Sequence, residues 1–363
     1  MRLHNGFEVP VPPAWMRWLP AGWVALVVVL EFALPTQWAV SFLLIALPAI
    51  AAYTIGPALV AAITVFAIVL EAVLAATHEH MWEDHHVAAY IATALVGTLA
   101  TALAAHRRRQ ERHLVHANSV AEALMRTLLR PVPHQVGHVL AAALYRPAEA
   151  GTMVGGDLFD IHATKQGERA LIGDVRGKGL QAVRTVAAIL GSFREAAYDV
   201  GNLLDVAARM ERRMAREAEE IADDELFVTA ALVEYDPLAH RVTIINHGHI
   251  EPVLISRGDV RALTGPPALP LGLGILTSDR PAAYTHRFTR GDVLLLVTDG
   301  LVEARDDTGT FYPLLDRLRH QFAGQLATGP AEVVDFLNTD LPRHSHAFHD
   351  DVAILAIAPH GQL

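Results

Sequence analysis

Aspartate recurs in four short segments of the chain, each beside an apolar run. The segments are residues 154–160, 173–179, 297–300 and 349–351. The apolar runs are typical of β-strands, so each carboxylate is expected at a strand end. Carboxylate oxygens gathered from several strand ends are hard ligands, the kind that bind Mg²⁺ or Mn²⁺ in proteins. Together the four segments predict a divalent-metal site and favour a metal-dependent hydrolase.

The amino-acid composition excludes some kinds of catalytic and binding site. No cysteine occurs and the 20 histidines are not spaced as a zinc cluster, which excludes thiol catalysis and disfavours a soft-ligand site. A net charge of −10 argues against binding of nucleic acid, which is itself anionic. A single aspartate at a strand end is usually a turn or cap residue. Four such segments, three of them with glycine, are difficult to explain in that way.

Hydrophobic residues make up 52% of the 363 residues and are concentrated in the first third. Four apolar stretches occur there, at residues 19–34, 38–53, 57–76 and 87–105. Crossing the hydrocarbon core takes about 20 residues, which the last two stretches provide and the first two reach only with flanking residues. A buried helical core is the alternative, but periodic polar faces are missing. We therefore expect residues 1–105 to form four transmembrane helices.

Basic residues set the expected orientation. Arginines gather directly after the last apolar stretch, at 107–109 and 112, and positive residues flank the cytoplasmic side of a span. With an even number of spans, both termini and the catalytic region would then be cytoplasmic, at the inner face of the cell membrane. The loop 78–86 would face outward. Its histidines and acids could sense a metal ion or pH, or could form only a polar connection.

A charged, helix-favouring segment, residues 106–133, connects the membrane region to the rest of the chain. It lacks Gly and Pro until Pro131, and its apolar residues recur at spacings of 3 and 4, at Leu114, Val115, Val120, Ala121, Leu124, Leu128 and Leu129. We predict a linker helix that forms a homodimer and transmits a signal, with a passive spacer as the alternative.

The remaining residues, 134–363, are predicted to form an α+β domain. Strands are expected at 139–146, 157–163, 169–175, 226–235, 242–246, 252–256, 260–263, 283–288, 292–298 and 352–358, and helices at 180–197, 203–221, 313–322 and 330–341. We expect strands 283–288 and 292–298 to pair around Gly291. Strands in hairpin succession with grouped helices favour a layered fold with antiparallel sheets.

Several ordered motifs resemble the metal-dependent protein phosphatases (the PPM superfamily), in the bacterial branch of SpoIIE- and RsbU-type serine phosphatases. Besides the acidic segments, the motifs are Leu-Leu-Arg-Pro, Asn-His-Gly-His, Pro-Leu-Gly-Leu and Thr-Asp-Gly-Leu-Val-Glu, at 128–131, 246–249, 270–273 and 298–303. The likeness extends from about Ala121 to the C-terminus. It implies an αββα sandwich of two mainly antiparallel sheets flanked by helix pairs.

The resemblance also implies a catalytic site. Carried over position by position, the metal ligands are Asp157, Asp174, the backbone carbonyl of Val175, Asp299 and Asp350, and the four aspartates are the catalytic residues. Two Mn²⁺ or Mg²⁺ ions would share Asp174 and a bridging water whose pKa they lower. The resulting hydroxide would attack phosphoserine or phosphothreonine in line, without a covalent phosphoenzyme.

Some residues near the ligands depart from the family pattern or have an open role. Arg176 stands where Ser is common, and could bind the substrate phosphate or point to solvent. His249 could donate a proton to the leaving oxygen, although such a turn more often orders its loop. Asp160 and Asp351 are expected to contact the ligand residues rather than the metal, with direct ligation as the alternative. Ala353 replaces the hydroxyl residue that usually follows the final acidic pair.

The partner implied by the resemblance is a phosphorylated antagonist of an anti-sigma factor. A pseudophosphatase scaffold, which binds a phosphoprotein without hydrolysing it, is the alternative, disfavoured because every side-chain ligand position is acidic. The segment 155–159 superficially resembles the signature of diguanylate cyclases, which carry a further acid where Leu158 stands and lack the other three acidic segments. A transporter is weaker still, because the spans contain no central charges.

Overall fold

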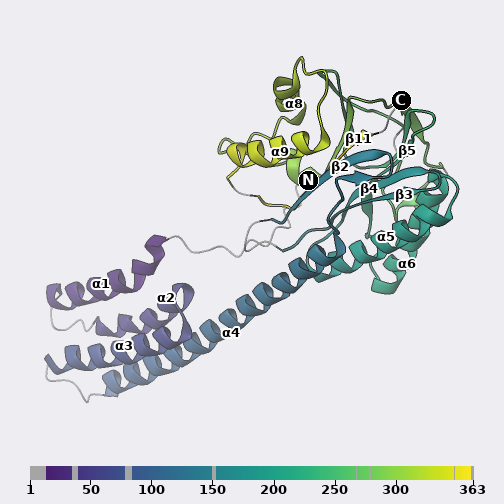
Figure 1. Cartoon of the computed structure of the whole chain (residues 1–363). Helices are drawn as coiled ribbons and strands as arrows, with labels where there is room; N and C mark the ends of the chain where they lie inside the picture. Colours follow the sequence, from purple (N-terminus) through teal and green to yellow (C-terminus); the bar gives the residue numbers. More distant parts are fainter. Residues whose placement is uncertain are drawn as a thin grey trace. The chain divides into compact units, whose positions relative to one another are not determined.

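The computed structural model describes residues 14–34, 40–77, 84–148, 153–266, 268–277, 279–346 and 348–360. The chain divides into two compact units, Met1–His116 and Ala117–Leu363 (Figure 1). Most of the expected outward loop, residues 78–83, lies outside the described residues, as does the start of the second apolar stretch.

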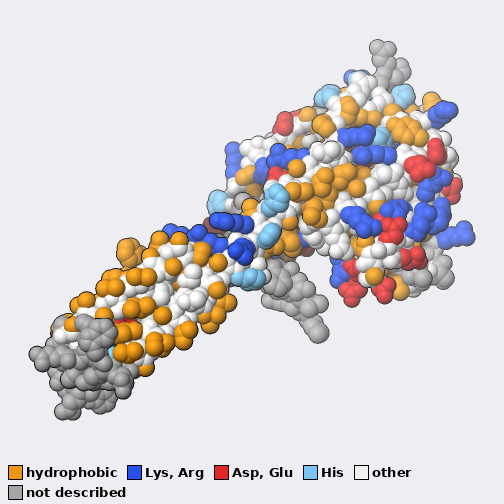
Figure 2. All heavy atoms as spheres, turned by 90° about the horizontal axis from the view of Figure 1, so that it is seen from below, with side chains coloured by type: hydrophobic (Ala, Val, Ile, Leu, Met, Phe, Trp, Pro, Cys, Tyr) orange, Lys and Arg blue, Asp and Glu red, His pale blue; other side chains and the backbone are white. Residues whose placement is uncertain are grey.

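The first unit is built from apolar helices. They are η1 (Ala14–Trp18), α1 (Leu19–Ala33), η2 (Ser41–Ala46), α2 (Leu47–Thr54), α3 (Pro57–Thr77) and the first part of α4 (Asp84–Leu128). Large apolar side chains remain on the outside of this unit, where Figure 2 shows them as orange spheres along the helices; Phe32 exposes 69% of its surface and Leu95 67%. Helices that are hydrophobic on all sides are typical of membrane spans rather than of a surface in water.

Three helices are long and apolar enough to cross a membrane: Trp15–Ala33, Pro57–Ala76 and part of His86–Leu128. The second predicted span corresponds to Ser41–Thr54, where η2 continues into α2, and is shorter than a usual span. Four transmembrane helices are therefore not confirmed by helix length. Buried polar contacts join these segments: Thr93 on α4 donates to Glu71 on α3 at 2.8 Å.

The second unit contains two antiparallel sheets. The six-stranded sheet has the order β1-β2-β11-β10-β7-β8, and the five-stranded sheet the order β3-β4-β5-β6-β9. The strands are β1 (Gln135–Val136), β2 (Val139–Arg146), β3 (Asp157–Thr164), β4 (Gly167–Val175), β5 (Val228–Asp236), β6 (Arg241–His247), β7 (Val253–Ser256), β8 (Asp259–Ala262), β9 (Tyr284–Arg287), β10 (Asp292–Val297) and β11 (Val352–Pro359). The α+β class and the antiparallel sheets predicted from the sequence are confirmed.

Helices cover the outer faces of both sheets. The pair α5 (Leu180–Asp199) and α6 (Leu203–Ile221) packs on the five-stranded sheet, and α8 (Leu314–Phe322) and α9 (Pro330–His344) pack on the six-stranded sheet (Figure 1). Two short helices, η3 (Gly274–Leu276) and α7 (Asp299–Val302), lie in connections between strands. The order helix, sheet, sheet, helix is the predicted αββα sandwich.

Strand β10 of the six-stranded sheet is buried on both faces. Leu294 and Leu296 belong to the core shared with the five-stranded sheet, whereas Val293, Leu295 and Val297 belong to the core beneath α8 and α9. Successive side chains of a strand point to opposite faces, so both faces of β10 are buried. This explains its unbroken apolar sequence, which an exposed face would interrupt with polar residues.

One predicted strand pairing is wrong. We expected strands 283–288 and 292–298 to form a hairpin, but β9 pairs with β6 in the five-stranded sheet, whereas β10 pairs with β7 and β11. The turn between β9 and β10 passes from one sheet to the other. Gly291 in this turn has a φ of +93°, and Asp292 accepts a hydrogen bond from the Thr289 backbone N–H at 2.7 Å. A tight turn therefore did not indicate a hairpin.

Candidate metal centre

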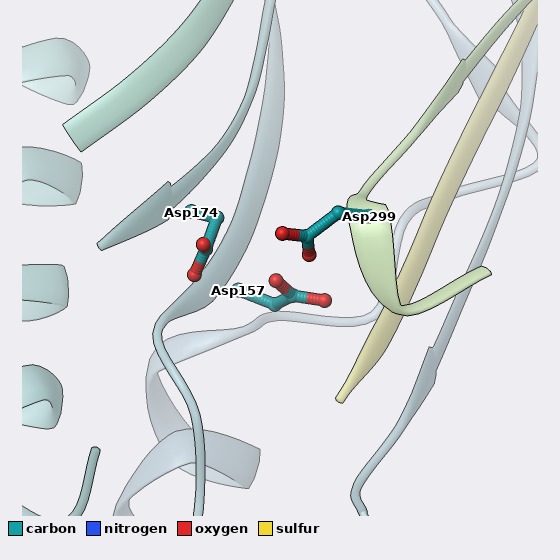
Figure 3. Close-up of side chains that lie close together, drawn as sticks. All are labelled: Asp157, Asp174 and Asp299. Atoms are coloured by element: carbon teal, nitrogen blue, oxygen red, sulfur yellow. The ribbon is translucent and has the colours of Figure 1, made fainter. Parts of the chain in front are cut away.

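Three of the predicted ligands converge between the two sheets. Asp157 and Asp174 stand directly opposite each other in the β3–β4 ladder, and Asp299 begins α7 immediately after β10. One carboxylate oxygen from each lies within 4.8 Å of the other two. Figure 3 shows the three side chains pointing toward a common space. The five-stranded sheet thus supplies two ligands and the six-stranded sheet the third.

Burial and mutual repulsion raise the pKa values of these carboxyl groups. Asp157 is 3% exposed, and burial together with the charge of Asp174 raises its pKa well above the ordinary value. Burial and the charges of Asp299 and Asp350 raise the pKa of Asp174 to about 8. The pKa of Asp299 is raised by burial and by Asp350. Carboxyl groups this close repel one another when all are ionised. Either a cation lies between them or some of them are protonated.

Thr298 orients the most buried ligand. Its hydroxyl donates to Asp157 Oδ2 at 2.5 Å and accepts a hydrogen bond from the Ala353 backbone N–H at 2.9 Å. Both roles of the hydroxyl are therefore used, which fixes the Asp157 carboxylate in one orientation. Sequence reasoning assigned no role to Thr298. Its position between β10 and Asp299 was the signal that could have identified it.

Two glycines allow backbone to approach the site closely. A Cβ at Gly156 would lie 2.4 Å from the Val175 carbonyl oxygen, and a Cβ at Gly300 would lie 1.8 Å from the Asp351 carbonyl oxygen. No side chain fits at either distance, so both positions require glycine. The close approach at Gly156 places the Val175 carbonyl, a predicted ligand, beside the loop that leads to Asp157.

The fourth predicted acidic ligand, Asp350, is not part of the converging group. Its side chain is 46% exposed, and its Oδ2 pairs with Lys178 Nζ at 3.1 Å. Lys178 also donates to the His349 carbonyl at 3.3 Å and lowers the pKa of Asp174 and of Asp299. Sequence reasoning gave no role to Lys178, the residue whose ammonium group holds Asp350.

Asp351 and Asp160 have supporting contacts. Asp351 is buried and accepts hydrogen bonds from the Tyr145 hydroxyl at 2.6 Å and from the backbone N–H groups of Ala148 and Gly155, each at 2.9 Å. Asp160 accepts from Arg194 at 2.6 Å and lies 3.3 Å from a His162 ring nitrogen. Neither carboxylate belongs to the group of three within 4.8 Å.

Arg176 and His249 each contact other residues in the structure. Arg176 pairs with Glu225, to whose backbone carbonyl it also donates at 3.0 Å, and its side chain is 42% exposed. His249 is buried, its Nδ1 lies 3.0 Å from Thr229 Oγ1, and burial lowers its pKa to about 4. A neutral imidazole at pH 7 is not a protonated acid. Asn246 holds its backbone through two hydrogen bonds, as expected of a residue that orders a loop.

The donor set fits one or more hard divalent cations. It consists of three carboxylates whose pKa values are raised by their proximity, with a backbone carbonyl and a fourth carboxylate nearby. All of these donors are oxygens, which Mg²⁺ and Mn²⁺ prefer. Within the described residues, this is the one group of three or more acidic or histidine side chains with such geometry.

Comparison with known proteins links this arrangement to phosphatases. The family described as stage II sporulation protein E (SpoIIE) matches residues 164–360. One similar protein is the phosphoserine phosphatase RsbU of Bacillus subtilis (strain 168), with 23% identity over 243 residues, 66% of this chain and 68% of that protein. The residues matched by the family include Asp174, Asp299 and Asp350, whereas Asp157 precedes them.

Solved structures share the fold. The SiaA-PP2C domain of Pseudomonas aeruginosa is similar with a TM-score of 0.53 and 19% identity, over 70% of this chain and 97% of that one. The PP2C phosphatase domain with a fragment of the regulatory domain of SpoIIE from Bacillus subtilis is similar with a TM-score of 0.51 and 17% identity, over 62% of this chain and 64% of that one.

Proposed function

This chain belongs to the stage II sporulation protein E (SpoIIE) family, and on that premise we propose that it is a membrane-anchored, metal-dependent phosphatase that hydrolyses phosphoserine or phosphothreonine in a protein. The observation that carries the proposal is the convergence of Asp157, Asp174 and Asp299 between the two sheets. The raised pKa values of these residues make the site favourable for cations.

The chain's own residues have distinct tasks in this proposal. Asp157, Asp174 and Asp299 would hold two Mn²⁺ or Mg²⁺ ions, the number that the family resemblance implies, with the Val175 carbonyl as a further ligand. When bound, such ions act as Lewis acids that make water more nucleophilic and offset charge on the phosphoryl group. Thr298 occupies one oxygen of Asp157 and leaves the other for an ion.

Asp350 and Lys178 would act at the exposed side of the site. The pair is about one-third to one-half exposed, so it exchanges with solvent more easily than a buried ion pair. If Lys178 swings away, Asp350 becomes available as the fourth acidic ligand. The freed ammonium group is then near enough to attract the phosphate of a substrate.

The substrate is proposed from the relatives. The similar RsbU protein is named a phosphoserine phosphatase. We extend this to a phosphorylated protein as the substrate, and to a phosphorylated anti-sigma-factor antagonist as the partner. The catalytically silent scaffold is the competing function, and it predicts binding of the same phosphoprotein without release of phosphate.

Four crossings of the membrane are supported by the arrangement of the first unit. The 6 residues of η2 and 8 residues of α2 extend roughly 24 Å, because a 3₁₀-helix rises about 2.0 Å per residue and an α-helix about 1.5 Å. Arg107 on α4 donates to the carbonyls of Ala52 and Tyr53 near the end of α2, at 2.9 and 2.5 Å. The end of α2 and the basic end of the last apolar stretch therefore lie at the same level, which we assign to the cytoplasmic side.

Dimerisation through the linker helix is part of the proposal. Leu114, Val115 and Leu124 on α4 are exposed, and apolar side chains at such spacings are suited to a partner helix. The mass of the full chain in detergent, measured by light scattering, should correspond to two copies. A single-copy mass across the accessible concentration range would contradict the dimer.

Phosphate release is the direct test of the enzyme. The purified full chain should release phosphate from a phosphorylated antagonist protein with Mn²⁺ or Mg²⁺ and should stop when a chelator is added. Asp174→Asn and Asp299→Asn should each lower the rate by at least about 100-fold. Replacing a residue that hydrogen-bonds to a metal ligand typically lowers activity about 10- to 100-fold, and loss of a ligand itself is expected to have a larger effect.

Asp335→Asn is the matched control. Asp335 is an exposed acid on α9, outside the group of converging carboxylates, and its replacement should leave the rate unchanged. Turnover that persists in excess chelator would refute the metal-dependent mechanism. Binding of the phosphoprotein without turnover, by wild type under all metal conditions, would favour the scaffold.

A further inference from the structure

A pocket of about 430 Å³ lies in the first unit, at the turn between α2 and α3. Its polar side chains are Arg17 from η1, Thr54 from the end of α2 and Arg108 from α4, and Gly56 lines it from the turn. The remaining lining is apolar and includes Ile55, Pro57 and Leu59. The pocket thus combines cationic side chains with a surface that would suit a lipid.

Arg17 and Arg108 differ from Arg107 because neither has an acidic or carbonyl partner within the described residues. Arg107 donates to two carbonyls and pairs with Glu111 at 3.2 Å. Arg17 and Arg108 have no such contact there, and no Asp or Glu is among the described residues that line the pocket. The Thr54 hydroxyl oxygen, also in the lining, is buried and has no hydrogen-bond partner among the residues that the structure describes. A guanidinium group and a hydroxyl are both donors.

The backbone adds further positive character. The pocket opens at the first turn of α3, a helix of 21 residues whose N-terminus carries a partial positive charge and unpaired N–H groups. Gly56 lets Arg108 lie against this turn, because a Cβ there would be 2.3 Å from the Arg108 Cζ. Two arginines beside a helix N-terminus repel one another unless an anion lies between them.

Aromatic residues indicate the depth of the pocket in a membrane. Trp15 and Trp18 flank Arg17, and Tyr53 precedes Thr54; all three are exposed. Trp and Tyr concentrate at the level of the lipid headgroups. These aromatic residues are those expected at the level of the lipid phosphates, if the first unit spans a bilayer.

We propose that this pocket binds the phosphate of an anionic phospholipid headgroup. The proposal rests on the membrane anchoring proposed above. Arg17 and Arg108 would donate to the phosphate oxygens in the bidentate geometry that guanidinium groups favour. The Thr54 hydroxyl and the free N–H groups of α3 would supply further donors. The lipid would thereby join the first helix to the fourth at the point where α4 leaves the apolar bundle.

Native mass spectrometry of the full chain in detergent tests the proposal, with phosphatidylglycerol as the probe and phosphatidylcholine as the zwitterionic reference. Wild type should retain phosphatidylglycerol in preference. The double variant Arg17→Gln/Arg108→Gln should lose that preference by at least about tenfold, since a charge-assisted hydrogen bond contributes about 1.5–3 kcal/mol. Arg17 and Arg108 are exposed, and Arg109→Gln/Arg112→Gln removes the same charge from two likewise exposed positions outside the pocket, so this control should retain the lipid.

Gly56→Ala gives a second test that changes no charge. The added methyl group would displace the Arg108 guanidinium and should weaken phosphatidylglycerol retention, while single Arg108→Gln serves if the double variant unfolds. Equal retention by all variants would mean general electrostatic attraction and would overturn the proposal. Displacement of the lipid by millimolar inorganic phosphate would assign the pocket to a free anion and would overturn it as well.

Membrane fractionation separates this inference from the anchoring on which it rests. If the chain sediments with membranes but shows no headgroup preference, only the lipid pocket fails. If the chain is found in the soluble fraction, the anchoring itself fails and the lipid pocket fails with it.

Discussion

Asp157 and Asp160 lie three positions apart on one strand and show how surroundings decide the behaviour of a carboxyl group. Burial and neighbouring acids raise the pKa of Asp157. Burial acts in the same direction on Asp160, but hydrogen bonds and charges from His162 and Arg194 outweigh it and lower the pKa. The first group therefore requires a cation from solution, whereas the second already has one within the protein.

The raised pKa of Asp174 predicts pH-dependent metal binding. Its pKa shifts from 3.8 to about 8, so the proton stays bound in the folded, metal-free protein over a range in which the unfolded chain has lost it. The stabilisation by this proton is complete below pH 3.8 and is lost as pH rises through about 8. Because metal must displace the proton, Mn²⁺ affinity should fall about tenfold for each pH unit below that value.

Calorimetric titration with Mn²⁺ between pH 6 and 9 measures this dependence. Repeating it in buffers of different ionisation enthalpy counts the protons released. An affinity that does not change over this range, with no proton release, would contradict the assignment of Asp174 as a protonated ligand.

Lys178 should oppose metal binding. Its ammonium group lies 3.1 Å from Asp350 and repels an incoming cation. At pH 9, Lys178→Gln should tighten Mn²⁺ binding by roughly two- to fivefold, the range expected of a partly exposed ion pair worth up to about 1 kcal/mol. Lys165→Gln, at the exposed β3–β4 turn, is the control and should leave the affinity unchanged. Weaker binding by the Lys178 variant would refute this role.

Sequence identified the converging aspartates because their position beside apolar runs is visible in one dimension. The roles of Thr298 and Lys178 were missed, since they depend on hydrogen bonds and charges from segments that only the fold brings together. Asp350 was predicted on the same grounds as the other three aspartates, but in the structure it pairs with Lys178 and lies outside the group of three carboxylates. The spacing of residues along the chain does not indicate that Lys178 pairs with Asp350.

At the scale of elements, Asp351 connects the start of strand β11 to the segment that precedes Asp157. Its buried carboxylate accepts from Tyr145 on β2, from Ala148, and from Gly155 directly before β3. Asp351→Ala would leave three donors without an acceptor and should lower the free energy of unfolding by about 3 kcal/mol or more. Tyr145→Phe removes one of these hydrogen bonds and should cost about 1 kcal/mol.

Urea denaturation of the fragment Ala117–Leu363, followed by circular dichroism, measures both variants. An Asp351→Ala protein within 0.5 kcal/mol of wild type, roughly the limit for a neutral surface substitution, would show that the three contacts contribute little to stability.

The long elements could be predicted from the sequence, whereas the short elements β1 and α7 could not. Helix α6 repeats its buried residues at Leu203, Val206, Met210 and Met214, a clear helical period, and its bounds agree with prediction. β1 and α7 contain 2 and 4 residues, too few to show any period. The partner of β9 depends on which sheet the chain enters after Gly291, and a local turn signal does not specify that.

At the scale of the whole molecule, the absence of cysteine makes the proposed topology testable with single introduced thiols. Met16→Cys and His113→Cys should react with a membrane-impermeant maleimide only after the cells are permeabilised, because four crossings place both on the cytoplasmic side. Leu34→Cys should react in intact cells. Labelling of Met16→Cys from outside would mean that Ser41–Thr54 does not cross and that the spans are three.

The division of the ligands between the sheets makes a bound ion a cross-link. Asp157 and Asp174 belong to one sheet and Asp299 to the end of a strand in the other. Thermodynamic linkage is reciprocal: whatever separates the sheets weakens ion binding, and ion binding resists their separation by the same free energy. Amide hydrogens of β4 and β10 should consequently exchange more slowly with Mn²⁺ than without it. Metal occupancy would thus report on the internal cohesion of the sandwich as well as on its chemistry.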